Sequence, residues 1–224
     1  DDADLERSAQ AANFGAFMHQ GQICMSVERV IVHEKVYDTF VKQFLERVRK
    51  LKVGSSNEKE NVLGPVINDR AADRLQAQFD DAKAKGAKVL AGGEIDGRYV
   101  SATVFSGVTP DMLMYQQESF GPVCSIFKVR NDEEAIRIAN DSEYGLTAGV
   151  MTEDEARGLA IVNQLETGNC HVNCSPVNDE PHVPFGGFKA SGSGKHGGRW
   201  SMETFTETRW ITMERGGRGF PPVF

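Results

Sequence analysis

The feature that most constrains the fold of this chain is the alternation of short apolar runs with longer segments of helical periodicity. An acidic run at residues 1–4 leads into a first helical segment expected at residues 3–20, and a β-branched run follows at 30–32. Strands that alternate with helices of this length are typical of α/β domains, whose crossover helices cover a parallel sheet. The sequence therefore predicts an open, mainly parallel, twisted sheet with helices on both faces.

The later segments continue this pattern. Further helices are expected at 36–51, 68–85, 132–140 (capped by Asp132) and 154–165, with strands at 87–91, 123–129, 146–151 and 168–172. Residues 174–198 are rich in Gly, Pro, Ser and His and predict a long loop of the kind that often carries function. Residues 205–213 alternate like a strand. We expect one domain over residues 1–198 and a separate C-terminal segment over 199–224.

The composition excludes several classes of protein. The 224 residues carry a net charge of −7, which argues against nucleic acid or an anionic membrane as the main partner. No apolar run has the length of a membrane span. Four scattered cysteines are too few for a disulfide scaffold and favour a reducing, cytoplasmic location. Because the chain opens on Asp1 without an initiator Met, we expect it to be a fragment of a longer protein.

Cys24 is the strongest candidate for a reactive residue. It follows the helix break at Gly21, so its thiol is expected to have an open approach and nearby backbone N–H dipoles that lower its pKa. The alternative is a buried cysteine that packs as a small apolar side chain. The residues around it do not decide between the two.

The glycine-rich stretch after residue 184 does not form a phosphate-binding loop. A Walker A motif needs a glycine where Lys189 stands and a Ser or Thr where His196 stands. The chain also has no evident G-x-G-x-x-G dinucleotide motif. Phosphate binding through either motif is therefore not expected within this chain.

Late in the chain, four side chains have the chemistry of metal ligands: Cys170, His171, Cys174 and His182. Their spacing is poor for a zinc site, since neighbouring strand residues point to opposite faces. No metal site is expected. A thiol hydrolase remains open, because His19 and His33 lie near Cys24 in sequence without a diagnostic spacing.

Several segments, in this order, resemble the C-terminal part of the aldehyde dehydrogenase family. They are 17–24 (FMHQGQIC), 118–122 (ESFGP), 144–150 (YGLTAGV), 172–173 (VN) and 184–192 (PFGGFKASG). The segments 24–29, 178–183 and 206–212 further resemble the branch that acts on salicylaldehyde, vanillin and benzaldehyde. The resemblance implies the catalytic domain of an NAD- or NADP-dependent enzyme that oxidises a small, aromatic aldehyde.

The resemblance also implies roles for individual residues. Cys24 would attack the aldehyde carbon, and its own backbone N–H would help to hold the oxyanion. Glu118 stands at the position that binds the nicotinamide ribose, and Phe120 stands beside the ring. Phe185 would line the aldehyde tunnel, and two further side chains are expected on the same wall: Phe17 and Ile23.

Parts of the family's machinery are expected upstream of this chain. These parts are the dinucleotide-binding domain, the glutamate general base and the asparagine of the oxyanion hole. His19 also stands where many members have asparagine. The chain by itself is therefore not expected to oxidise aldehydes.

The C-terminal segment suggests an oligomer, and two functions other than aldehyde oxidation remain open. Residues 209–214 match the family's oligomerisation strand, which implies a homo-oligomer, a dimer or tetramer. One alternative is that the chain acts as a non-catalytic assembly piece. The other is a thiol esterase or hydrolase, whose activity Cys24→Ala would abolish without any cofactor.

Overall fold

A four-stranded sheet organises the computed structural model, which describes residues 1–217 and 219–222. Its strand order is β1-β6-β5-β2, and the strands are β1 (Arg29–His33), β6 (Val123–Val129), β5 (Thr103–Ser106) and β2 (Lys88–Ala91). β1, β6 and β5 run parallel, while β2 pairs antiparallel to β5. The central position of β6 explains why all of its residues except Lys128 are buried, the polar Ser125 included.

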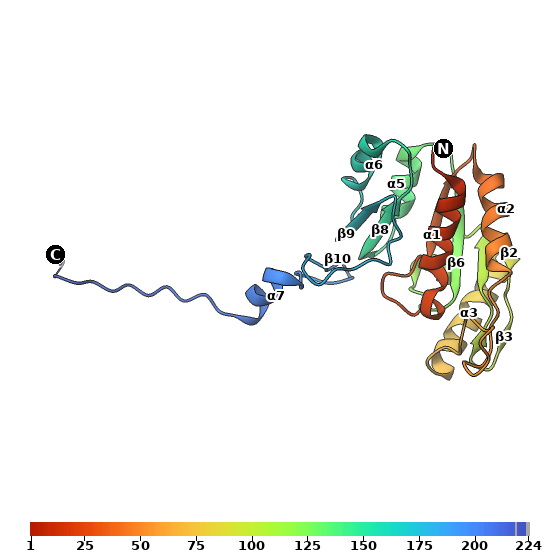
Figure 1. Cartoon of the computed structure of the whole chain (residues 1–224), viewed down its shortest axis with the longest axis horizontal. Coiled ribbons are helices and arrows are strands. Elements are labelled where there is room, and N and C mark those ends of the chain that lie inside the picture. The colour runs from red at the N-terminus through yellow and green to blue at the C-terminus, as the bar shows by residue number, and fades with distance from the viewer. Residues whose placement is uncertain (218, 223–224) are drawn as a thin grey trace.

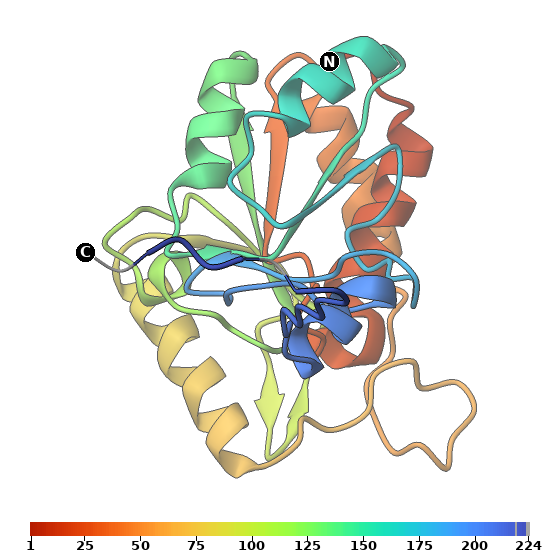
Figure 2. The ribbon, with the colours of Figure 1, turned by 90° about the vertical axis from the view of Figure 1, so that its left-hand side faces the viewer.

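Helices cover both faces of this sheet (Figure 2). One apolar cluster gathers α1 (Leu5–Phe17) and α2 (Tyr37–Val48) over Val104 and Ile126. The other gathers α3 (Asp69–Ala84), α4 (Leu113–Gln116) and α5 (Asp132–Asn140) over Phe105 and Phe127. Successive residues of one strand thus enter opposite clusters, as the pleat of a sheet requires. The predicted α/β class with helices on both faces is confirmed.

Shorter elements complete the chain (Figure 1). They are a 3₁₀ turn η1 (Met18–Gly21), the hairpin β3 (Ile95–Asp96) with β4 (Tyr99–Val100), the pair β7 (Tyr144–Gly145) with β10 (Phe188–Lys189), and the helix α7 (Gly198–Phe205). A separate parallel pair joins β8 (Thr147–Val150) to β9 (Asn169–Val172), and α6 (Glu155–Val162) packs on both strands.

Polar contacts attach the β8–α6–β9 unit to the start of the chain. Arg157 bridges Asp132 (2.6 Å) and Asp1 (2.7 Å), so its guanidinium joins α6, α5 and the first residue. The carboxylate of Asp2 accepts a hydrogen bond from the hydroxyl of Thr152 (2.6 Å). The hydrogen bond from Arg157 holds the pKa of Asp132 below its usual value, so this carboxylate remains charged near neutral pH.

Two expectations about local structure are wrong. The side chain that caps α5 is Asn131, which accepts from the Glu134 backbone N–H (2.9 Å), and Asp132 instead pairs with Arg157. The strand expected at 205–213 is not formed: α7 ends at Phe205, and residues 206–213 have no regular secondary structure. A strand needs a hydrogen-bonding partner, and within the described residues this segment has none.

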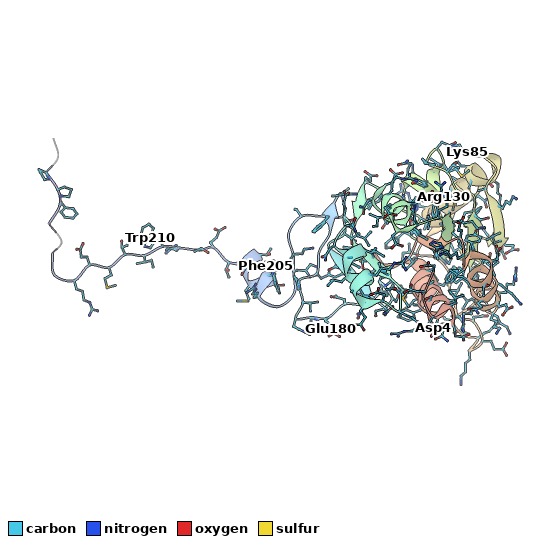
Figure 3. The ribbon with its side chains drawn as sticks, turned by 90° about the horizontal axis from the view of Figure 1, so that it is seen from above. Asp4, Lys85, Arg130, Glu180, Phe205 and Trp210 are labelled. Carbon is cyan, nitrogen blue, oxygen red and sulfur yellow. The ribbon has the colours of Figure 1, made fainter. Side chains whose placement is uncertain are left out.

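Residues 206–217 and 219–222 extend away from the body of the molecule (Figures 1 and 3). Phe205 and Trp210 are 86% and 89% exposed, so the apolar face that suggested a strand is open to solvent. Among the helices of the described residues, none combines the length and the apolar character needed to cross a bilayer.

Arg29 fastens the first strand to two helices. Its guanidinium donates to the carbonyl oxygens of Ile138 (2.7 Å) and Asp141 (2.8 Å) at the end of α5. It also donates to the carbonyl oxygen of Tyr115 (2.7 Å) and lies 4.3 Å from the centroid of the Tyr115 ring. Arg29, the first residue of β1, thus donates to three backbone carbonyls that belong to other elements.

We predict that Arg29→Met lowers the free energy of unfolding by about 3 kcal/mol, because partly buried carbonyls lose charged donors and the ring loses a cation. Arg49→Met is the matched control, since Arg49 is exposed and makes one long bond to Leu90 O (3.4 Å). Its cost is expected to stay within about 0.5 kcal/mol. Urea unfolding measures both, and equal losses would contradict the role given to Arg29.

Candidate active site

Cys24 lies exposed in a tight turn between α1 and β1. The Ser26 backbone N–H donates to Ile23 O (2.8 Å) and closes this turn. The expected helical segment 3–20 ends early, at Phe17, because His19 has a left-handed backbone (φ 53°) that no α-helix contains. The element that follows Cys24 is the strand β1, so Cys24 lies in a turn and not at the N-terminus of a helix.

The turn that contains Cys24 packs against a second loop through a close contact between the backbones of Gly21 and Gly121. Gly21 has φ +65°, and a Cβ added there would overlap the carbonyl oxygen of Gly121. Only glycine allows this approach and this conformation without strain. Gly121 follows Glu118, Ser119 and Phe120, which we call the 118–120 loop. The contact therefore places the Cys24 turn beside the loop that the sequence singled out.

Side chains hold the 118–120 loop from both sides. From α3, Arg74 donates to Ser119 O (3.0 Å) and Gln78 donates to Glu118 O (3.4 Å). From the opposite side, Glu28 Oε1 accepts from the backbone N–H groups of Ser119 (2.8 Å) and Phe120 (3.0 Å). Four backbone groups of this short loop are thus hydrogen-bonded to side chains, which fixes its position.

Glu28 is the site residue that the sequence analysis missed. The pKa of Glu28 is raised to about 7, mainly because the carboxyl is largely removed from water. The two hydrogen bonds from backbone N–H groups lower this pKa but do not outweigh the burial. The charge of Glu118 raises it slightly, and that of Arg29 lowers it. The segment 24–29 had contributed only to a resemblance. A carboxylate directly before a β-branched strand is the signal that was available, because such a residue enters the interior beside the strand.

A cavity of about 640 Å³ brings several predicted residues together. Cys24, Ile23 and Glu118 all line it, and so does Glu28. The cavity continues along β1 and β8, so only the end near Cys24 concerns a small substrate. An exposed thiol and an exposed carboxylate on one cavity give the site a nucleophile and an acceptor for hydroxyl groups.

The aromatic residues named from the sequence do not gather at this cavity. Phe17 is 2% exposed and stacks on Phe44 (ring centroids 6.3 Å apart), so its ring belongs to the core between α1 and α2. Phe120 is half-buried with φ 50°. Phe185 lies in the long loop, with its ring 5.2 Å from His196.

The glycines of the other matching segments serve close packing. A Cβ at Gly145 would overlap the carbonyl oxygen of Glu166, and one at Gly186 would overlap that of Gly194. Lys195 Nζ donates to the carbonyls of Gly168 (3.2 Å) and Gly186 (2.6 Å). These segments therefore hold the long loop in place, with no contact to Cys24 required.

The other cysteines differ from Cys24 in their surroundings. Cys124 is buried in β6, and burial raises the pKa of its thiol strongly, so it stays protonated. Cys170 is exposed, but its sulfur lies 3.0 Å from the Thr167 hydroxyl. Cys174 is exposed in the long loop. Exposure alone does not distinguish Cys24; its place beside the 118–120 loop does.

We predict that Gly21→Ala destabilises the protein by about 3 kcal/mol or more, because the left-handed backbone and the overlap with Gly121 add. The control is Gly97→Ala, where φ is +56° but a Cβ would meet nothing within 4 Å, so about 1 kcal/mol is expected. Thermal unfolding distinguishes them. Similar losses at both positions would show that the backbone contact is not tight.

The raised pKa of Glu28 predicts a pH dependence of stability. Between about pH 4.5 and 7 the folded state keeps a proton that the unfolded state has released, so the contribution of Glu28 to stability is greatest below 4.5 and is lost as the pH rises through 7. Glu28→Gln should remove this contribution, which amounts to roughly 3 kcal/mol at most. Urea unfolding across this range checks it, and parallel curves for both proteins would contradict the buried carboxyl.

Comparisons with known proteins identify the family of this chain. The model of the aldehyde dehydrogenase family matches residues 1–211. Vanillin dehydrogenase of Pseudomonas fluorescens is 46% identical over 99% of this chain and 46% of its own length. The NAD-dependent benzaldehyde dehydrogenase of Pseudomonas putida is 45% identical over 98% of this chain and 45% of its own. The chain thus spans about half the length of the curated relatives it matches.

Solved structures give the same result. The salicylaldehyde dehydrogenase of Pseudomonas putida G7, crystallised with salicylaldehyde, superposes with a TM-score of 0.95 at 41% identity, over 99% of this chain and 46% of that one. An NADP-bound glyceraldehyde-3-phosphate dehydrogenase of Bacillus halodurans superposes with a TM-score of 0.86 at 39% identity, over 90% of this chain and 42% of that one. The family match and these relatives show that the chain belongs to the aldehyde dehydrogenase family.

Proposed function

We propose that this chain is the cysteine-bearing part of an NAD- or NADP-dependent enzyme that oxidises aromatic aldehydes to carboxylic acids. The observation that carries the proposal is the exposed Cys24 turn, locked by Gly21 and Gly121 against the loop that bears Glu118. Within this family, that arrangement places a nucleophile next to a group suited to binding a nucleotide.

Cys24 supplies the covalent step. Its thiolate attacks the carbonyl carbon of the aldehyde, and the backbone N–H of Cys24 donates to the oxygen that becomes negative. Loss of hydride from this thiohemiacetal leaves a thioester on Cys24. Water then cleaves the thioester, which releases the carboxylic acid and restores the thiol. The general base and the second oxyanion donor are proposed to lie outside residues 1–224.

The residues of the 118–120 loop fit a nicotinamide cofactor, which accepts hydride when bound. Glu118 is exposed beside the Cys24 turn, and its carboxylate can accept hydrogen bonds from ribose hydroxyls. The half-exposed ring of Phe120 offers an apolar surface to a flat heterocycle. The choice between NAD and NADP depends on contacts to the 2′-position of the other ribose.

The aromatic substrate class is proposed from the named activities of the relatives, which act on vanillin, benzaldehyde and salicylaldehyde. Ile23 lines the cavity directly before Cys24 and is proposed to contact the aromatic ring. Phe185 is proposed to close the substrate tunnel from the long loop. Phe17 is better assigned to the core.

The C-terminal tail supports a proposal about assembly. Residues 209–214 present Trp210, Ile211 and Met213 to solvent at 72–89% exposure. We propose that this segment pairs with a neighbouring subunit of a cytoplasmic homo-oligomer, where a partner strand would satisfy its backbone groups.

The test is cofactor reduction by the full-length protein with benzaldehyde, vanillin, salicylaldehyde and propanal, each with NAD and with NADP. We expect the aromatic aldehydes to give the higher kcat/KM values. Cys24→Ser should lower the rate by roughly a thousandfold or more, because the alkoxide needed for attack is scarcely formed. Cys170→Ser, at an exposed thiol that does not line the cavity, is the control and should keep nearly full activity.

The competing functions make different predictions for the same protein. Ester hydrolysis by Cys24 without any cofactor reduction would favour a thiol esterase. No activity of either kind from the full-length protein would favour a non-catalytic assembly role. Equal activity of Cys24→Ser and the wild-type protein would overturn the assignment of the nucleophile.

A further inference from the structure

Glu28 joins the two loops of the site from a position anchored in the sheet. Its backbone carbonyl accepts from the Ser125 N–H (2.8 Å), where β1 begins to pair with β6. Its side chain leaves this anchored backbone and reaches the 118–120 loop, where a single oxygen accepts two N–H groups. The carboxylate therefore connects the central sheet to the loop, four residues after Cys24.

The accepted N–H groups belong to the most strained part of the loop. Phe120 has φ 50°, a left-handed conformation that a bulky side chain rarely adopts. Such a residue persists only where its surroundings impose the conformation. Glu28 does so from one side, and Arg74 holds the carbonyl of Ser119 from the other (3.0 Å). Without Glu28, the loop would lose the contact that fixes the N–H groups of Ser119 and Phe120.

We propose that Glu28 is a positioning residue for the cofactor: its carboxylate sets the location of Glu118 and Phe120 relative to Cys24. This inference rests on the proposed function, since it assumes that Glu118 and Phe120 face the nicotinamide half of the cofactor. Glu28 acts through the loop and does not need to touch cofactor or aldehyde.

The surroundings of Glu28 favour positioning over proton transfer. The oxygen that faces the loop already accepts two hydrogen bonds, which fixes the direction of the carboxyl. Both the neutral and the ionised carboxyl can accept these bonds, and so can the amide oxygen of glutamine. A positioning role therefore tolerates Glu28→Gln, whereas a general base does not.

The experiment measures steady-state kinetics of the full-length protein in three Glu28 variants. Glu28→Ala and Glu28→Met remove the acceptor, and Met keeps most of the volume. We expect both to raise the KM for the cofactor about tenfold, while the KM for the aldehyde changes less than about twofold. Glu28→Gln should restore the cofactor KM to within about twofold of the wild type. Glu46→Ala, an exposed glutamate of α2, is the control and should match the wild type.

Amide hydrogen exchange of residues 118–121 provides a second readout that needs no activity. Exchange should be at least about tenfold faster in Glu28→Ala and Glu28→Met than in the wild type, and unchanged in Glu28→Gln. If the wild-type protein reduces neither NAD nor NADP, the proposed function fails, while exchange still tests the contact.

Several outcomes would overturn the proposal. A cofactor KM unchanged in Glu28→Ala and Glu28→Met would show that the loop does not depend on Glu28. An equal rise in both KM values, or misfolding of both variants while Glu28→Gln folds, would show a structural role only. A loss of kcat in Glu28→Gln with both KM values unchanged would identify a general base instead.

Discussion

The backbone of Gly21 lies against the carbonyl of Gly121, and the geometry of the whole site depends on this contact. It requires α1 to end at Phe17 and the chain to reverse through left-handed residues before Cys24. On its other side Gly121 faces Leu75 of α3, with no space for a side chain there either. The Cys24 turn therefore lies against a loop that α3 supports, so close packing fixes its position.

Charge placement complements this packing. The site keeps a partly buried carboxyl at Glu28, whose pKa is raised because the group is largely removed from water. Backbone N–H groups of Ser119 and Phe120 offset part of that cost, and the same bonds hold a strained Phe120. The arrangement stabilises one loop conformation at the expense of global stability. Such local costs are concentrated at sites that bind or react, which agrees with the membership of the family.

The sequence predicts those features that depend on local patterns. Residues 123–129 form β6 over the expected range because the run is mostly apolar and rich in β-branched residues, and Asn68 caps α3 where the helical pattern begins. The role of Glu28 is not predictable in this way, since its contact joins residues 91 positions apart. The strand expected at 205–213 depends on a partner that a single chain does not reveal. For Phe17, the local pattern predicts better than the resemblance does. The resemblance suggested a place on the wall of the substrate tunnel, whereas the structure places Phe17 in the core, as its position in the helical pattern indicates.

The central claim is that Cys24 carries the covalent step of aldehyde oxidation. Trapping tests it most directly: the full-length protein is mixed with benzaldehyde and NAD or NADP, quenched in acid, digested and mapped by mass spectrometry. The account predicts a benzoyl thioester on the peptide that contains Cys24 and on no other cysteine. A benzoyl group on Cys124, Cys170 or Cys174, or turnover without any acylated cysteine, would contradict it.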